Sequence, residues 1–339
     1  CKDTIAPTGT IAQGVQAKQV NAKGEVYEHI YGLTTSQRVY GTVRENQLGH
    51  GPCYLKTSGI TAEQDQDLLK AYLNMAPSQT LKWIESGKMP SEQDVEIQGT
   101  EPYIVGGHTA SGFWVDTRRE TTIHGLYAAG DVAGGCPQKY VTGALAEGKI
   151  ASLAIIEQLK DDHSEETSEI EKQAQMILAD YEKIRNGENG LFTIDELEEA
   201  MQKVMDEYAG GIASNYQFNE KQLNLAEEKI TRLSELADQV GAEDMHELLF
   251  AYELKERLLV CQVLIEHLKN RKETRWHSFG ENTDYPEQSE EWMKYVNSRM
   301  ENGEIKILYR DLVTKETADK QTAGSKPSQN TAEKGAGER

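Results

Sequence analysis

The sequence predicts a mixed α/β N-terminal part followed by an all-α C-terminal domain. Residues 1–160 are rich in glycine and hold most of the prolines, which indicates short strands, turns and some helix. Residues 161–300 are acidic, rich in Glu, Lys and Leu and nearly free of proline, and apolar residues recur there at helical spacing. The length of 339 residues accommodates two or three domains.

Local signals define the first elements of the N-terminal part. An apolar-polar stretch at 15–20 predicts a strand that meets a turn at 21–24. A helix is expected over 65–76, because Pro77 cannot continue it, and a second short helix is expected over 78–86.

Further along, two short strands are predicted at 114–116 and 123–129. The second leads into Gly130-Asp131, and an apolar stripe then predicts a helix over 144–159. Strand, glycine-rich loop and helix in this order build ligand crevices in α/β folds.

The C-terminal part is predicted to be a helical bundle. Its helices are expected where the 3.6-residue period is clearest, at 168–186, 194–208, 219–239 and 244–269. Residues 313–339 contain no large apolar side chain after Val313, so this tail is predicted to be disordered.

Composition excludes several classes of protein. The chain carries 56 acidic against 36 basic residues, a net charge of −20, which argues against nucleic acid as a main partner. No run of about 18 apolar residues is present, so no membrane span is expected and a cytoplasmic location is predicted. The four cysteines are scattered without a C-x-x-C pair, which argues against a metal site, an iron–sulfur cluster or a disulfide framework.

The stretch from Glu101 to Gly148 is the most informative for chemistry. Its dense glycines allow a backbone to approach a ligand closely. Asp131 suits hydrogen bonding to ligand hydroxyls, and the Thr142-Gly143-Ala144 entry to a helix presents free N–H groups to negative charge. From the residues alone, a nucleotide or flavin site and an ordinary glycine-rich loop both remain open.

Two separated blocks resemble the succinate dehydrogenase/fumarate reductase flavoprotein superfamily. Leu126–Asp131 and Ala144–Gly148 are similar to its C-terminal flavin-binding segment. The other block resembles its C-terminal helical domain and contains Glu247-Leu248-Leu249, Arg271–His277, Asp284-Tyr285-Pro286 and Trp292. The resemblance implies part of a capping domain at 1–95, the C-terminal part of an FAD-binding domain at 96–162, a helical domain at 163–312 and the tail at 313–339.

Within the superfamily, three features resemble the adenylylsulfate reductase alpha-subunit branch. Glu101–His108 is similar to the segment before that family's catalytic pocket. Lys139 stands where dicarboxylate enzymes place a substrate-binding arginine. The third feature is a resemblance to the capping region, carried by Ala6–Gly9 together with Ala17–Glu25.

The resemblance also implies roles for individual residues. His108 and Arg38 correspond to catalytic-pocket residues, and Lys139 and Arg44 to groups that meet the substrate anion. On residue type alone, His108 is typical of a loop histidine bonded to a carbonyl, and Arg38 of an ion-pair arginine. The residues that correspond to the FAD contacts are Gly130, Asp131, Thr142, Gly143, Ala144 and Leu145.

The implied activity is the reduction of adenylylsulfate to sulfite and AMP, or the reverse, through a flavin N5–sulfite adduct. Electrons would come from a ferredoxin-like iron–sulfur beta subunit. The alternatives are a fumarate reductase, succinate dehydrogenase or L-aspartate oxidase, and an inactive truncated remnant. The chain begins at Cys1 without Met and lacks G-x-G-x-x-G near its start, so we expect it to be the C-terminal part of a longer flavoprotein and to hold FAD weakly alone.

Overall fold

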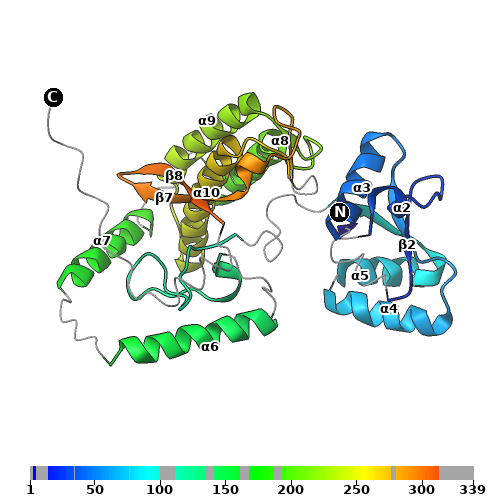
Figure 1. Cartoon of the computed structure of the whole chain (residues 1–339), viewed down its shortest axis with the longest axis horizontal. Helices are drawn as coiled ribbons and strands as arrows, with labels where there is room; N and C mark the ends of the chain where they lie inside the picture. Colours follow the sequence, from blue (N-terminus) through cyan, green and yellow to red (C-terminus); the bar gives the residue numbers. More distant parts are fainter. Residues whose placement is uncertain are drawn as a thin grey trace. The chain divides into compact units, whose positions relative to one another are not determined.

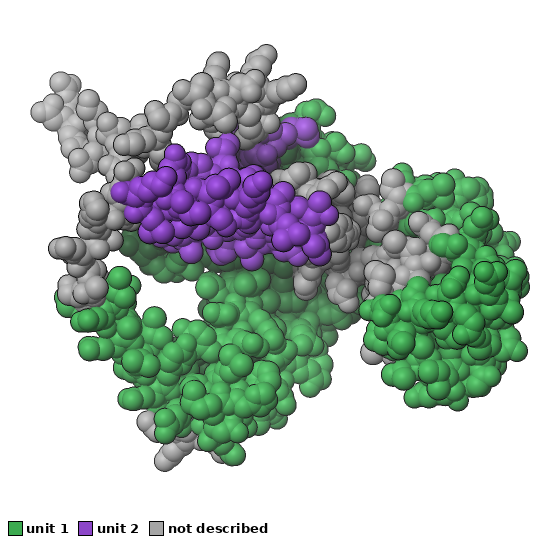
Figure 2. Space-filling model, turned by 90° about the horizontal axis from the view of Figure 1, so that it is seen from below, with its two compact units in different colours: residues 1–109, 164–292, 298–307 green, residues 110–163, 293–297, 308–339 purple. Residues whose placement is uncertain are grey.

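The computed structural model divides the chain into two compact units, coloured green and purple in Figure 2. Unit 1 comprises residues 1–109, 164–292 and 298–307, and unit 2 comprises residues 110–163, 293–297 and 308–339. The residues that the structure describes are 3–4, 14–33, 35–75, 77–99, 111–134, 141–160, 168–185, 192–275 and 280–312. The predicted tail at 313–339 lies outside them, and the predicted domain boundaries stay predictions.

A four-stranded sheet lies in the N-terminal part of unit 1. Its strands are β1 (Asp3–Thr4), β2 (Lys18–Val20), β3 (Cys53–Lys56) and β4 (Val95–Gln98), in the order β1-β4-β3-β2. β1 runs parallel to β4, and the other two pairs are antiparallel. Cys53 lies opposite Ile97 and Leu55 opposite Val95, and all four side chains are buried, so one face of the sheet forms the core.

Among the described residues, four α-helices complete this part (Figure 1). They are α2 (Glu28–Tyr31), α3 (Thr35–Gln47), α4 (Ala62–Met75) and α5 (Pro77–Ser86). The helices predicted at 65–76 and 78–86 are confirmed, although α4 begins earlier, and the strand predicted at 15–20 is confined to 18–20 because residues 14–16 form a turn. Pro77 not only ends α4 but opens α5, where its missing N–H costs nothing.

The C-terminal part of unit 1 is the predicted helical bundle. α9 packs against both of its neighbours in sequence, as Figure 1 shows, and its buried Ile230 joins Leu197 and Leu254 in one core. The helices agree with the predicted ranges to within two residues: α7 (Ser168–Arg185), α8 (Ile194–Tyr208), α9 (Glu220–Ala237) and α10 (Met245–Asn270). This core shares no residue with the core of the N-terminal part.

A reciprocal pair of hydrogen bonds fixes the start of α8. The Glu196 N–H donates to Thr193 Oγ1 at 3.2 Å, and the Thr193 N–H donates to Glu196 Oε2 at 2.9 Å. We expect Thr193→Ala to lower the free energy of unfolding of the bundle by about 1 kcal/mol, because a backbone N–H loses its acceptor. Urea unfolding followed by helical circular dichroism checks this. Thr193→Ser keeps the hydroxyl and should match the wild type, and an equal loss in both variants would contradict the capping explanation.

A compact polar cluster follows α10. The Glu273 side chain is 0% exposed and accepts hydrogen bonds from Arg275 Nε at 2.9 Å, Arg275 Nη2 at 2.8 Å and Arg271 Nη1 at 2.5 Å. The Ser289 N–H donates a further bond to Glu273 at 3.0 Å. Nearby, β5 (Gln217–Phe218) pairs in parallel with β6 (Glu281–Asn282). The pairing of β5 with β6 ties the segment after α10 to the bundle.

The expectation of an all-α C-terminal domain is wrong at its end. Residues 294–311 form a hairpin of β7 (Lys294–Glu301) and β8 (Glu304–Asp311) after the short 3-10 helix η5 (Glu290–Trp292). Asn302 and Gly303 join the strands with φ of 52° and 82°. Two consecutive positive φ values belong to the type I′ turn, for which Asn-Gly is the strongest sequence signal.

The strands predicted in unit 2 are also wrong. Residues 114–116 and 123–129 contribute single bridges, Val115 with Thr121 and Glu120 with Tyr127, and no continuous strand. The chain turns tightly directly after the first of these ranges, because Asp116 Oδ1 accepts the N–H groups of Arg118 and Glu120, at 2.8 and 3.0 Å.

Candidate functional site

Unit 2 brings the predicted cofactor-binding residues together. The 3-10 turn η3 (Gly130–Val132) packs on α6 (Val141–Gln158), which confirms and extends the helix predicted at 144–159. Gly130 has φ of 75°, and a Cβ on it would lie 3.2 Å from the Cβ of Ala144. Glycine is therefore required here both by the backbone conformation and by the close approach of the turn to the helix.

The start of α6 suits a negatively charged group. The helix begins at Val141, so Thr142, Gly143 and Ala144 lie in its first turn, where backbone N–H groups have no partner within the helix. The helix dipole adds positive potential at the same place. Leu145 is 70% exposed, which leaves apolar surface next to these amides. This arrangement fits a flavin. The amides suit negative charge, the exposed Asp131 on the adjoining turn suits the hydroxyl groups of the flavin side chain, and Leu145 suits apolar contact.

Sequence reasoning missed a buried ion pair beside this turn. Glu147 of α6 accepts the Gly130 N–H on Oε2 at 3.1 Å, and its Oε1 lies 3.5 Å from Arg119 Nη2. The neighbouring Arg118 donates to the Ala154 carbonyl at 3.1 Å. The sequence signal that could have predicted this ion pair is Glu147 itself, which is the one acidic residue in the mostly apolar first half of α6.

Arg38 and Arg44 both lie on α3. Arg38 is buried, and its Nη2 is 3.3 Å from Glu28 Oε2, while Lys18 Nζ lies 3.3 Å from the other Glu28 oxygen. Arg44 is half-buried and donates to Gln47 Oε1 at 2.6 Å. The buried pair with Glu28 holds Arg38 in a fixed orientation. The catalytic and substrate-binding roles of these two arginines stay predictions.

His108 and Lys139 lie outside the described residues, so their predicted roles stay predictions. Cys53 and Cys261 are reduced thiols, and burial raises the pKa of the Cys261 thiol to about 11. In the part of the chain that the structure describes, no group of three or more His, Cys, Asp or Glu residues could hold a metal ion. None of the described helices is both long and apolar enough to cross a membrane.

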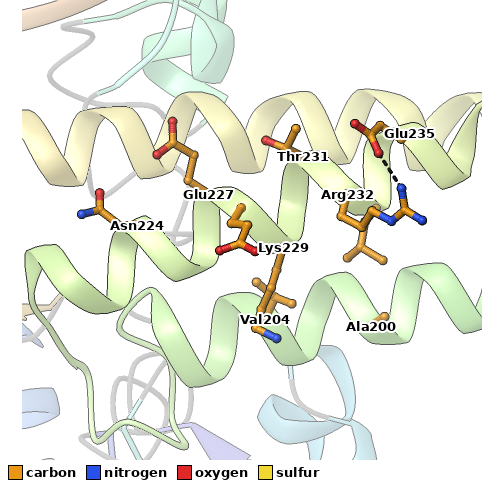
Figure 3. A pocket seen from close by; sticks show the side chains of 10 residues that line it. Ala200, Val204, Asn224, Glu227, Lys229, Thr231, Arg232 and Glu235 are labelled. Atoms are coloured by element: carbon orange, nitrogen blue, oxygen red, sulfur yellow. Dashed lines mark hydrogen bonds and ion pairs between the residues drawn. The ribbon is translucent and has the colours of Figure 1, made fainter.

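An open groove of about 870 Å³ lies between α8 and α9 (Figure 3). Ala200 and Val204 line it from α8, and charged side chains of α9 line it opposite, including Arg232, which pairs with Glu235 at 2.8 Å. Charges of both signs face this groove, and no residue predicted for the site lies in it. We therefore assign the candidate site to the turn and helix start of unit 2.

Comparisons with known proteins show which chains this one is similar to. Residues 198–329 match the family model described as the fumarate reductase flavoprotein C-terminus. The chain is 26% identical, over 360 residues, to the adenylylsulfate reductase alpha subunit of Megalodesulfovibrio gigas, with 88% of this chain and 54% of that subunit covered. The chain therefore spans about half the length of this relative.

Solved structures give the same result. Adenylylsulfate reductase from the hyperthermophilic Archaeoglobus fulgidus matches with a TM-score of 0.80 and 29% identity, covering 91% of this chain and 57% of that chain. A structure of adenosine-5-phosphosulfate reductase in complex with sulfite, as a covalent adduct, matches with a TM-score of 0.79 at 29% identity and the same coverage.

The fumarate reductase branch shares the fold. An Escherichia coli quinol fumarate reductase variant matches with a TM-score of 0.76 at 19% identity, covering 91% of this chain and 56% of that chain. At that identity the likeness concerns the fold alone, whereas the adenylylsulfate reductases are more similar in sequence as well. The chain is therefore similar to adenylylsulfate reductase alpha subunits over most of its length, and its residues 198–329 are similar to the C-terminal part of the fumarate reductase flavoprotein.

Proposed function

We propose that this chain is part of an FAD-dependent adenylylsulfate reductase alpha subunit, which interconverts adenylylsulfate with sulfite and AMP. The observation that carries the proposal is the match to adenylylsulfate reductase over 91% of the chain at 29% identity. The fumarate reductase match has similar coverage but only 19% identity. Bound FAD supplies the two-electron chemistry at sulfur, and the protein binds, orients and neutralises the reacting groups.

The described residues of unit 2 fit the cofactor part of this role. Asp131 offers a carboxylate to the flavin hydroxyls. The first-turn amides of Thr142, Gly143 and Ala144 stabilise negative charge at the start of α6. Leu145 provides apolar contact beside them.

The substrate part of the role rests on cationic residues. Adenylylsulfate is a mixed anhydride of phosphate and sulfate, so its binding requires cations in a partly desolvated pocket. Arg38 and Arg44 supply guanidinium groups, whose planar forks suit phosphate and sulfate oxygens, and Lys139 supplies a point charge. His108 transfers a proton or supplies charge, a role for which histidine is the most common side chain. A ferredoxin-like iron–sulfur partner subunit would supply or accept the electrons of the reaction.

An assay with alternative substrates tests the proposal. The protein that carries this chain is purified with its iron–sulfur partner, and ferricyanide reduction is followed with sulfite, with sulfite plus AMP, and with succinate. We expect sulfite oxidation that depends on AMP. His108→Ala and Arg38→Ala should each lower kcat/KM by about 100-fold or more. Activity with succinate alone would favour the dicarboxylate branch, and no activity with any substrate would favour the inactive remnant.

A further inference from the structure

One buried carboxylate of unit 2 has no part in the chemistry proposed above. The side chain of Glu147 is 6% exposed, although it lies on a helix whose neighbouring residues are mostly apolar. A buried carboxylate requires partners that compensate for its lost hydration. The partners of Glu147 come from two other segments of unit 2.

The first partner is the backbone of the cofactor-binding turn. Gly130 is buried, and its N–H donates to Glu147 Oε2 at 3.1 Å. Because Asp131 follows Gly130 directly, this bond fixes the residue that carries the exposed carboxylate. Gly130 also lies against Ala144. Two residues of α6, Ala144 and Glu147, therefore hold the turn.

The second partner is a residue with a constrained backbone. Arg119 has φ of 72°, a conformation that non-glycine residues rarely adopt, and its Nη2 lies 3.5 Å from Glu147 Oε1. Arg119 Nη1 also donates to the Asp116 carbonyl at 3.3 Å, and the Arg119 carbonyl accepts the Ala128 N–H at 3.0 Å. Surrounding bonds therefore hold Arg119 where it can meet Glu147. A strained backbone conformation of this kind persists only where several surrounding contacts stabilise it.

We infer that Glu147 is a positioning residue for FAD, acting through the Gly130 amide rather than by touching the cofactor. Glu147 holds η3, which carries Asp131, against the N-terminal end of α6. Asp131 and the free N–H groups of α6 are then in position before FAD binds. This inference rests on the proposed function. Without the carboxylate, the buried Gly130 N–H would lack an acceptor, and the turn would move toward water. FAD binding would then have to restore the turn, which lowers the affinity.

Four variants test the inference in the protein that carries this chain, after removal and titrated return of FAD. Glu147→Ala removes the acceptor, and the FAD dissociation constant should rise about tenfold. Glu147→Asp keeps the charge but is one methylene shorter, so about a threefold rise is expected. Glu147→Gln keeps an acceptor oxygen and should stay near the wild-type value. Glu157→Ala is the control, because Glu157 lies on the same helix, is 69% exposed and pairs with Arg118.

The outcomes separate the inference from the proposed function. A role in stability alone predicts lower melting temperatures with unchanged FAD affinity at a temperature where every variant is folded, and that result would overturn the inference. If Glu147→Ala does not fold, Glu147→Asp decides, and a wild-type dissociation constant there would also overturn it. A wild-type protein that binds no FAD would instead remove the proposed function, and the inference with it.

Discussion

Glu273→Ala is expected to lower the free energy of unfolding of the helical bundle by about 3–5 kcal/mol. The side chain is 0% exposed and receives bonds from two arginines and a backbone N–H. Removing it leaves the cations of Arg271 and Arg275 partly buried without their anion. Breaking such a pair costs more than the pair itself contributes, because the remaining charge stays desolvated.

The same cluster predicts a dependence on pH. Burial alone would raise the pKa of the Glu273 carboxyl, but the hydrogen bonds from Arg275, the Ser289 N–H and Arg271 together hold that pKa below its ordinary value of 4.5. A lowered pKa in the folded state means that the stabilisation is complete above 4.5 and is lost as the pH falls through the folded-state pKa. Glu273→Gln should therefore lose less stability than the wild type on acidification.

Calorimetric unfolding between neutral and acidic pH measures both effects. Glu290→Ala is a suitable control, because Glu290 is exposed on the same segment and should change the stability by no more than about 0.5 kcal/mol. Equal losses in the two alanine variants at neutral pH would contradict the role given to the cluster.

Trp83→Ala is expected to destabilise the N-terminal part of unit 1 by about 3–5 kcal/mol. Trp83 is 1% exposed, and its ring packs edge-on against Tyr72 with centroids 5.1 Å apart. Its Nε1 donates to the Gln93 carbonyl at 3.4 Å, which links α5 to the segment before β4. Alanine would leave a cavity that the surrounding sheet and helices can fill only in part.

Hydrogen exchange of the β3 and β4 amides measures this loss without requiring the whole chain to unfold in one step. Leu81→Ala is the matched control, because Leu81 lies on the same helix and is 55% exposed. Exchange in α9 and α10 should stay unchanged in Trp83→Ala, since the two cores share no residue. Faster exchange in both parts would contradict their independence.

The helices were predictable because their signals are local. A 3.6-residue period and side-chain caps at Thr193, Asn219 and Asp244 define α8, α9 and α10 within the sequence itself. The hairpin at 294–311 also had a local signal, Asn302-Gly303, which was overlooked. The strand predicted at 114–116 failed because the chain turns directly after it, where Asp116 Oδ1 accepts the N–H groups of Arg118 and Glu120.

The candidate site was predictable in its residue types but not in its contacts. The glycine at 130 and the helix entry at Thr142-Gly143-Ala144 follow from local rules on turns and helix starts. The bond between Glu147 and Gly130 joins residues that only the folded chain brings together. Similarly, nothing local indicates that Arg38 is buried against Glu28.

The two separate cores of unit 1 have a consequence for how this sequence can diverge. Because none of the described side chains belongs to both, a substitution that repacks one core requires no compensating change in the other. Each part can therefore accumulate mutations at its own rate, limited by its own stability. The N-terminal part, in which Arg38 lies on α3, can therefore change its core while the helical bundle keeps its sequence. The bundle can equally change its core while the N-terminal part keeps its sequence.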